Sequence, residues 1–193
     1  MQIHHRHSIR LKRHDYTSNG MYFITICIHN HHCLFGNIEN RKMQPNPFGQ
    51  IARDQWYELP NRFPDLELDA FVVMPNHVHG ILILDDTVSS GLIETNVGAG
   101  FTPALVPESG RATARVAPTS VSKIIGMYKS LVLHHAIQYI KSNCPDMLLG
   151  KLWQRGFYDH IVRDHRSYEK IANYIINNPT NWHNDKFYGR TIN

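Results

Sequence analysis

Runs of apolar residues along the chain predict four strands. They cover residues 21–28, two short stretches between about 66 and 84, and 152–162, where Gly156 interrupts the pattern. These runs are rich in β-branched and aromatic residues, as buried or half-buried strands usually are. The two runs between 66 and 84 meet near Pro75, so they are predicted to be neighbouring strands joined by a tight turn.

Three other stretches have the spacing of amphipathic helices. The first follows Pro47 and ends at Pro60 and Pro64, and its apolar positions predict that Trp56 belongs to the core rather than to a base-stacking surface. The second begins at Thr119-Ser120 and stops at Asn143-Cys144-Pro145. The third covers 168–177, with Asp164 and Ser167 as N-cap candidates. The residues that make up these helical stripes are Ala52, Trp56, Leu59 and Phe63 in the first stretch, Ile125, Tyr128, Val132, His135 and Tyr139 in the second, and Tyr168, Ile171, Ala172 and Ile175 in the third.

The order of these elements predicts the fold class. Strand, helix, strand, strand, helix and strand form the β-α-β-β-α-β pattern of an α+β, ferredoxin-like sandwich, with one antiparallel sheet and its helices on one face. An extra C-terminal helix follows. We expect one domain over 1–193, with a flexible Gly/Ser/Thr/Pro-rich insertion at about 85–118 and a loose polar tail beyond Trp182.

Composition and charge narrow the class of protein. The chain has 193 residues, 42% of them hydrophobic, and a formal charge of +4, with a pI near 9.0. This balance favours a polyanionic partner such as nucleic acid. Three cysteines argue against a disulfide framework, and no apolar run is long enough to span a bilayer or to act as a signal peptide. We therefore expect a cytoplasmic protein without a membrane partner.

His77 and His79 are the first candidates for chemistry. On a strand, side chains two residues apart point the same way, so both imidazoles would project from one face while Val78 faces the other. Such a pair can form half of a divalent-metal site. A His-x-His in a histidine-rich chain is more often incidental. Here, however, it lies in the most hydrophobic part of the sequence, where an unpartnered imidazole is costly.

A second histidine-rich stretch, His29-Asn30-His31-His32-Cys33, is a weaker metal candidate. No Cys-x-x-Cys or histidine pair lies at zinc-finger spacing downstream. We expect these histidines to be structural residues of a loop.

Tyr174 and Asn178 lie four residues apart on the last predicted helix, so they share a helical face. Tyr174 falls at the edge of the apolar stripe. Spacing alone favours a half-buried packing tyrosine and an asparagine that caps the helix before Pro179. The alternative is that a phenol and an amide oxygen meet a metal held by His77 and His79.

Four groups of residues together resemble a known family. In chain order they are Ser8-Ile9-Arg10-Leu11 with Asp15-Tyr16 and Tyr22-Phe23-Ile24-Thr25-Ile26-Cys27, then Val73-Met74-Pro75-Asn76-His77-Val78-His79-Gly80, then Trp153-Gln154-Arg155-Gly156-Phe157-Tyr158-Asp159-His160 with Ile161 and Arg163, and finally Tyr174-Ile175-Ile176-Asn177-Asn178-Pro179. The chain resembles the single-tyrosine HUH transposases of bacterial insertion sequences, in particular the REP-associated tyrosine transposase branch. The resemblance covers nearly the whole chain outside the 85–118 insertion and the C-terminal tail, and the insertion departs from the family pattern.

The resemblance implies a role for each matching residue. His77 and His79 match the metal-binding pair, Tyr174 the catalytic tyrosine, and Asn178 the third, polar metal ligand. Asp159 and His160 match a recurrent pair that we take as possible support for the active site. The implied cofactor is Mg²⁺ or Mn²⁺, which two imidazoles, an amide oxygen and water suit; ligand softness would also permit Zn²⁺.

The resemblance also implies a substrate and a reaction. The substrate is single-stranded DNA with a stem-loop, cut and rejoined through a 5′-phosphotyrosine. Such a protein acts as a monomer or a homodimer. Candidates for contacts with the DNA backbone are Arg10, Lys12, Arg13, Lys123, Lys129, Arg155 and Arg163, for each of which solvated surface charge is equally compatible.

Three alternatives stay open at this point. A non-catalytic or domesticated protein that binds DNA hairpins would keep the fold, although all four site residues are present. A replication initiator or conjugative nickase would be expected to carry a second domain. An RNA-binding module is a third possibility, because the ferredoxin-like sandwich also hosts RNA readers.

Overall fold

The computed structural model of the chain describes residues 19–85 and 119–189. The basic N-terminal residues Arg10, Lys12 and Arg13 lie outside these ranges, as does nearly all of the predicted 85–118 insertion. No described helix has the length and apolar content needed to cross a membrane.

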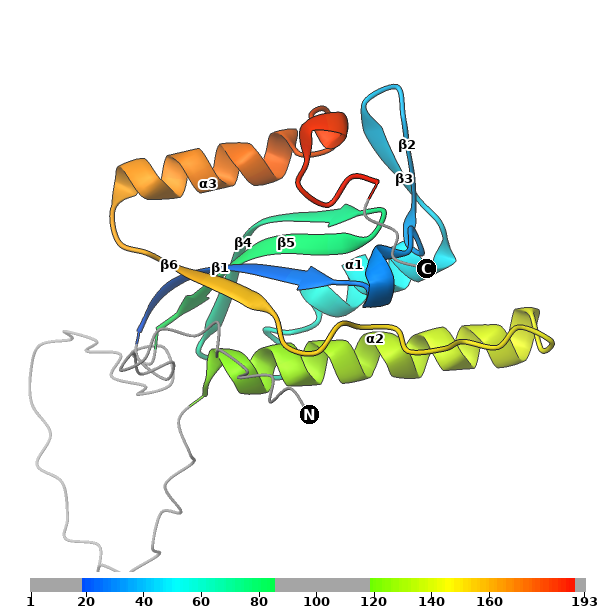
Figure 1. Cartoon of the computed structure of the whole chain (residues 1–193). Coiled ribbons are helices and arrows are strands. Elements are labelled where there is room, and N and C mark those ends of the chain that lie inside the picture. Colours follow the sequence, from blue (N-terminus) through cyan, green and yellow to red (C-terminus); the bar gives the residue numbers. More distant parts are fainter. Residues whose placement is uncertain (1–18, 86–118, 190–193) are drawn as a thin grey trace, which may run out of the picture.

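A four-stranded antiparallel sheet forms the centre of the fold (Figure 1). Its strands are β1 (Gly20–Cys27), β4 (Leu66–Met74), β5 (His77–Leu84) and β6 (Tyr158–Val162), in the spatial order β4-β5-β1-β6. With β1 inside the sheet between β5 and β6, this is the ferredoxin-like arrangement that the sequence predicts. The last strand is shorter than expected, because residues 152–157 contribute only an isolated bridge between Trp153 and Ile28.

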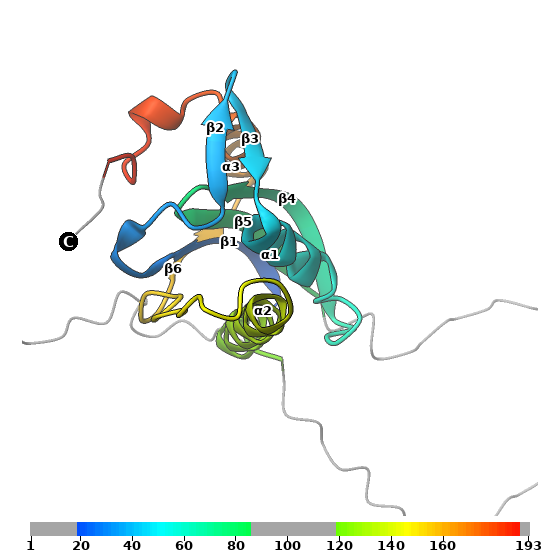
Figure 2. The same ribbon diagram turned by 90° about the vertical axis from the view of Figure 1, so that its right-hand side faces the viewer.

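The helices lie on both faces of the sheet (Figures 1 and 2). Helix α1 (Pro47–Tyr57) and the long α2 (Val121–Asn143) cover one face, as expected for the sandwich. The additional helix α3 (His165–Asn177) lies on the opposite face, over β4, β5 and β6. The side chains of Asn46, Ser120 and Asp164 cap the three helices by accepting backbone N–H bonds.

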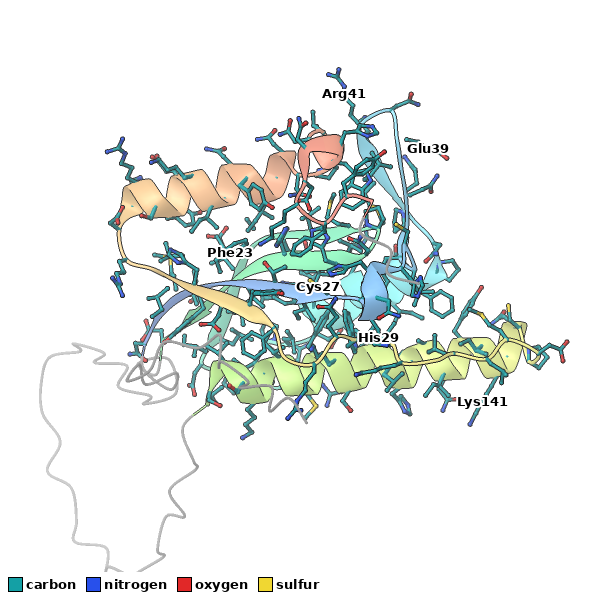
Figure 3. All side chains as sticks on the ribbon, viewed as in Figure 1. Phe23, Cys27, His29, Glu39, Arg41 and Lys141 are labelled. Carbon is teal, nitrogen blue, oxygen red and sulfur yellow. The ribbon has the colours of Figure 1, made fainter. Side chains whose placement is uncertain are left out.

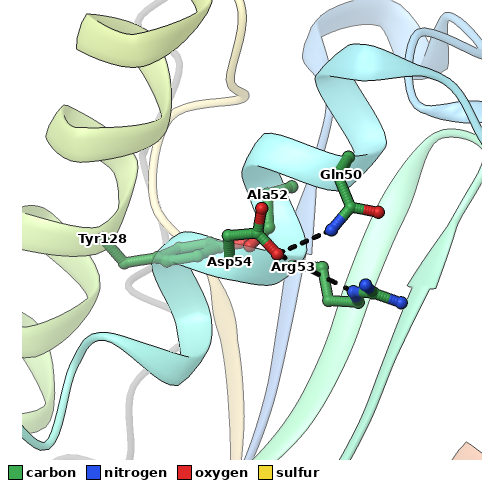
Figure 4. A network of polar contacts seen from close by, with 5 residues as sticks. All are labelled: Gln50, Ala52, Arg53, Asp54 and Tyr128. Atoms are coloured by element: carbon green, nitrogen blue, oxygen red, sulfur yellow. Dashed lines mark hydrogen bonds and ion pairs between the residues drawn. The ribbon is translucent and has the colours of Figure 1, made fainter.

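The main core fills the space between the sheet, α1 and α2. Trp56 is fully buried there, as predicted, and stacks on Phe71 at 4.5 Å between ring centroids. Tyr128 of α2 packs edge-on against Trp56, and its hydroxyl donates to the backbone oxygen of Ala52 at 3.0 Å (Figure 4). His135 is exposed rather than buried, so the prediction that it belongs to the packed stripe of α2 is wrong: Ala136 and Ile140 continue that stripe.

A β-hairpin between β1 and α1 was not predicted. Strands β2 (Gly36–Glu39) and β3 (Lys42–Pro45) pair antiparallel. They meet at Asn40 and Arg41, both of which have positive φ. A two-residue turn with positive φ at both positions has the same twist as the strands that it joins, so it is a favoured hairpin turn. Figure 3 labels Glu39 and Arg41 at its tip. The strands are short and polar, so no alternating pattern marks them.

The segment after α3 is packed rather than loose. It contains a 3-10 turn, Trp182–Asn184, and the side chains of Trp182 and Phe187 are only 7% and 2% exposed. The expectation of a loose tail is therefore wrong for the described residues. Two large apolar side chains within a polar stretch are the signal that could have indicated a packed segment.

Candidate active site

The histidine pair lies at the start of β5, on the face that α3 covers. Val78 and Leu82 belong to the core on the α1 and α2 side, so the alternation of the strand directs His77 and His79 to the opposite face. Both imidazoles are buried, with 0% and 1% of their surface exposed. The sequence thus places both rings in one layer between the sheet and α3, and Figure 3 labels Phe23 of β1 in the same layer.

Each imidazole is oriented by a hydrogen bond at Nδ1. His77 Nδ1 lies 2.8 Å from Asn76 Oδ1, and His79 Nδ1 lies 2.8 Å from Thr25 Oγ1. Thr25 is directly opposite His79 in the β1–β5 ladder. Because both Nδ1 atoms are hydrogen-bonded, the two Nε2 atoms are the ones that can bind a metal. Metal-binding histidines in proteins are commonly oriented in this way, by a hydrogen bond at the ring nitrogen that does not bind the metal.

Burial lowers the pKa of both rings. The pKa of His77 lies well below its usual value because the ring is desolvated, and the nearby His79 lowers it further. Burial lowers the pKa of His79 to about 3, although the carboxylate of Asp185 acts in the opposite direction. Both imidazoles are therefore neutral at physiological pH, the form that binds a metal.

Tyr174 reaches the histidine pair from α3. Its hydroxyl lies 3.2 Å from His79 Nε2 and donates to Asp185 Oδ2 at 3.0 Å. The ring packs edge-on against Phe23 and against His79, with centroid distances of 6.2 and 5.2 Å, and 41% of the residue stays exposed. Burial raises the pKa of this phenol, and Asp185 adds to the rise.

Two oxygen-bearing side chains adjoin these groups. Asn178 is buried at the end of α3 and donates through Nδ2 to Asp185 Oδ2 at 3.0 Å. The ligand atoms of His77, His79 and Asp185 lie within 4.8 Å of one another. Within residues 19–85 and 119–189, this is the one group of three histidine, cysteine or acidic side chains close enough together to share a metal ion. Sequence reasoning missed Asp185, which lies in the tail that was expected to be loose.

Two buried atoms of this site have no hydrogen-bond partner among the described residues: Nε2 of His77 and Oδ1 of Asn178. Buried polar atoms are nearly always paired, so each such atom needs an explanation. Imidazole nitrogen together with amide and carboxylate oxygen is a donor set for a hard or borderline divalent cation. The residues present therefore fit a metal centre.

The C-terminal segment, residues 182–188, covers the histidine pair. The rings of Trp182 and Phe187 lie 6.0 and 4.7 Å from that of His77. The backbone oxygen of Phe187 accepts a hydrogen bond from Asn76 Nδ2 at 2.9 Å, and its ring stacks on His31. His31 of the histidine-rich loop thus takes part in packing, as expected for these loop residues.

Asp159 and His160 face opposite sides of the sheet. Asp159 pairs with Ile24, whose side chain is in the core on the α1 and α2 side, whereas His160 pairs with Phe23 on the α3 side. Only His160 therefore shares a face with the histidine pair.

Four of the basic residues predicted to contact the DNA backbone lie within the residues that the structure describes, and they differ in their exposure to solvent. Lys123, Arg155 and Arg163 are exposed. Lys129 is partly buried, and its ammonium donates to the backbone oxygens of Gln154 and Gly156. Burial lowers its pKa to about 8. In this arrangement Lys129 holds the loop before β6.

Comparison with known proteins adds two similarities. The chain is 38% identical over 186 residues to an uncharacterized protein of Haemophilus influenzae, covering 96% of this chain and 94% of that one. Among solved structures it is similar to a REP-associated tyrosine transposase bound to a REP hairpin, with a TM-score of 0.54, 18% identity, and coverage of 95% and 91% of the two chains. No model of a described protein family matches the chain.

Proposed function

This chain belongs to one family with the Haemophilus influenzae protein and has the fold of the REP-associated tyrosine transposase, and on that premise we propose that it is a metal-dependent transposase and nickase. It cuts and rejoins single-stranded DNA beside hairpins. The observation that carries the proposal is the convergence of Tyr174 from α3 with His79 from β5, whose side chains meet at 3.2 Å although they are 95 positions apart. Such a meeting of a nucleophile with candidate metal ligands is what the reaction needs.

His77 and His79 would hold Mg²⁺ or Mn²⁺ through their Nε2 atoms, with oxygen ligands from Asn178 and Asp185. The unpaired Nε2 of His77 and Oδ1 of Asn178 support this assignment. When bound, such a cation polarises the phosphoryl oxygens and offsets charge in the transition state. Asn76 and Thr25 keep the two imidazoles in the orientation that the site requires.

Tyr174 is the proposed nucleophile. Its phenolic oxygen attacks the phosphorus, the bond from phosphorus to the 3′ oxygen breaks, and the DNA is left with a 5′-phosphotyrosine and a free 3′-OH. The Tyr174 hydroxyl donates to Asp185 Oδ2, so this carboxylate is placed to accept the phenolic proton as the phenol attacks, and the leaving 3′ oxygen takes up a proton from solvent to become the 3′-OH. Reversal of the step by a 3′-OH reseals the strand, so no nucleotide cofactor is needed.

The cover formed by the C-terminal segment has a consequence for this reaction. With 0% and 1% of their surfaces exposed, His77 and His79 cannot meet a DNA phosphate directly. Phe187 must therefore move away from the pair, breaking the hydrogen bond from Asn76 to its backbone oxygen, while Asp185 stays beside the histidines as a ligand. The same cover favours the second candidate function, a DNA-hairpin-binding protein of this fold that does not cut.

Covalent adduct formation tests the proposal. Incubation with a hairpin oligonucleotide carrying unpaired flanks is expected to give a protein–DNA adduct on a denaturing gel when Mg²⁺ or Mn²⁺ is present. Chelation with EDTA is expected to abolish the adduct, and added Mn²⁺ to restore it, because the neutral imidazoles supply no charge to offset that of the phosphate. A fully paired duplex of the same sequence is the control. Binding without any adduct in either metal would instead support the non-cutting alternative.

Metal binding tests the two oxygen ligands separately from catalysis. We expect Asp185→Asn to weaken Mn²⁺ binding by more than about tenfold, because it removes the one formal negative charge of the cluster. Asn178→Ala is expected to cost less, since it removes a neutral donor. Titration calorimetry or the EPR signal of free Mn²⁺ gives both affinities, with Asp146→Asn on an exposed loop as the control. A larger loss in Asn178→Ala than in Asp185→Asn would make the amide the principal oxygen ligand.

A further inference from the structure

A small pocket lies beside edge strand β4, away from the histidine pair. Its volume is about 200 Å³, and it is lined by residues of β3, α1 and β4, among them Met43, Arg53, Tyr57 and Phe71. This is smaller than the usual 300–1,000 Å³ of a pocket for a whole small molecule. It suits a single flat group that enters from a larger ligand.

Two aromatic rings, Tyr57 and Phe71, form part of the pocket wall. Phe71 is held by its stacking on the fully buried Trp56, with 4.5 Å between the ring centroids and 10° between the planes. Tyr57 meets Phe71 edge-on at 5.9 Å and is 57% exposed. An exposed aromatic ring beside a rigid one is a platform on which another flat ring can stack.

Arg53 adds a positive charge at the same pocket. Its Nε lies 3.8 Å from Asp54 Oδ1, and its side chain is 53% exposed. Asp54 also accepts a hydrogen bond from Gln50 at 2.6 Å, so its charge is shared between two partners. In Figure 4 the Arg53 side chain extends from α1 toward the neighbouring strands. Its guanidinium has no other hydrogen bond or ion pair among the described residues and is free for an anion.

The position of the pocket relates it to the proposed active site. Val72, which also lines it, is directly opposite His79 in the β4–β5 ladder. The other β4 residues of the lining, Phe71 and Val73, are opposite Gly80 and Val78, which face α1 and α2. The pocket therefore lies at the β4 edge, one strand along the sheet from the histidine pair but on the opposite face. A strand of DNA that leaves the active site and turns around the β4 edge would therefore reach the pocket.

We propose that this pocket binds one unpaired nucleobase of the single-stranded DNA, stacked on Tyr57, while Arg53 contacts an adjacent phosphate. The inference rests on the proposed function and adds a specificity-determining subsite to it. An exposed aromatic ring, a cation beside it and a volume for one ring are the three features that single-stranded nucleic acid uses in proteins. An apolar side chain of a protein partner would fit the rings but would make no use of the guanidinium.

Binding measured in the Tyr174→Phe background tests the subsite without cleavage. A fluorescent hairpin oligonucleotide with unpaired flanks is the probe, together with a series that carries an abasic site at each unpaired position in turn. We expect Tyr57→Ala to weaken binding about tenfold and to remove the effect of one particular abasic position, as loss of a base-stacking ring does. Tyr57→Phe keeps the ring and is expected to bind like the parent.

Salt dependence separates the role of Arg53 from that of Tyr57. Arg53→Ala is expected to reduce the slope of log affinity against log salt by about one phosphate contact, whereas Tyr57→Ala leaves the slope unchanged. Lys141→Ala, on the exposed part of α2 labelled in Figure 3, is the matched loss of a cation. Unchanged affinity and abasic profile in both pocket variants would overturn the inference, leave the proposed function intact, and point to a protein side chain as occupant. Failure of the parent to bind any hairpin would overturn both.

Discussion

Tyr174→Phe is expected to abolish the covalent adduct with DNA while leaving the affinity for a hairpin oligonucleotide largely unchanged. The substitution removes only the hydroxyl that lies 3.2 Å from His79 Nε2 and 3.0 Å from Asp185 Oδ2. The packing of the ring against Phe23 and His79 is kept. Without a nucleophilic oxygen no phosphotyrosine can form, so we expect complete loss rather than a reduced rate. A denaturing gel measures the adduct and fluorescence anisotropy the affinity.

The matched control is Tyr188→Phe. Tyr188 is a comparably exposed tyrosine of the C-terminal segment, 45% exposed, and its ring packs against Trp182 and His183 rather than against the histidine pair. Adduct formation by this variant is expected to match that of the unmodified protein. An undiminished adduct in Tyr174→Phe would refute the assignment of the nucleophile, whatever the affinity for DNA. If Tyr188→Phe also lost the adduct, the loss in Tyr174→Phe would no longer identify the Tyr174 hydroxyl as the nucleophile.

The parts of the site that lie on regular elements could be predicted from the sequence. Alternation along β5 predicts that His77 and His79 share a face, and the helical spacing of α3 predicts that Tyr174 and Asn178 do. Asp185 follows no such periodicity. Its position is set by the packing of Trp182 and Phe187 on the histidine pair, a contact between residues about a hundred positions apart. Local patterns carry no information about such a contact.

The fold, like the site, has parts that the sequence predicts and parts that it does not. The four central strands and the two covering helices have apolar patterns that are long enough to be recognised in the sequence. The order of these elements specifies the ferredoxin-like sandwich. The amphipathic stripe of α3 predicts that it packs, but not on which face, because that depends on the length and course of the link from β6. The β2–β3 hairpin cannot be predicted from the apolar pattern for a different reason. It is stabilised by the turn at Asn40 and Arg41 rather than by an alternating apolar face.

Gly80→Ala is expected to destabilise the protein by at least about 3 kcal/mol, at the upper end of what overpacking costs. Gly80 follows His79 on β5 and faces α1, where a Cβ would lie 2.3 Å from Cζ2 and 2.8 Å from Cη2 of Trp56. That indole is fully buried and stacked on Phe71, so it has no room to yield. For a chain of this size the loss corresponds to a fall in Tm of roughly 6–12 °C, measurable by calorimetry or urea unfolding.

Gly126→Ala is the matched control, because a Cβ at that position of α2 meets nothing within 4 Å. Removing a glycine from a helix interior is expected to stabilise the protein by about 0.5–1 kcal/mol, so the two identical substitutions should act in opposite directions. The contrast isolates the close approach of β5 to α1 from the general effect of replacing glycine. Since Trp56 and Gly80 hold β5 against α1 directly beside the histidine pair, Gly80→Ala should also weaken Mn²⁺ binding. Wild-type stability in this variant would mean that β5 and α1 are farther apart than the packing described for Trp56 requires.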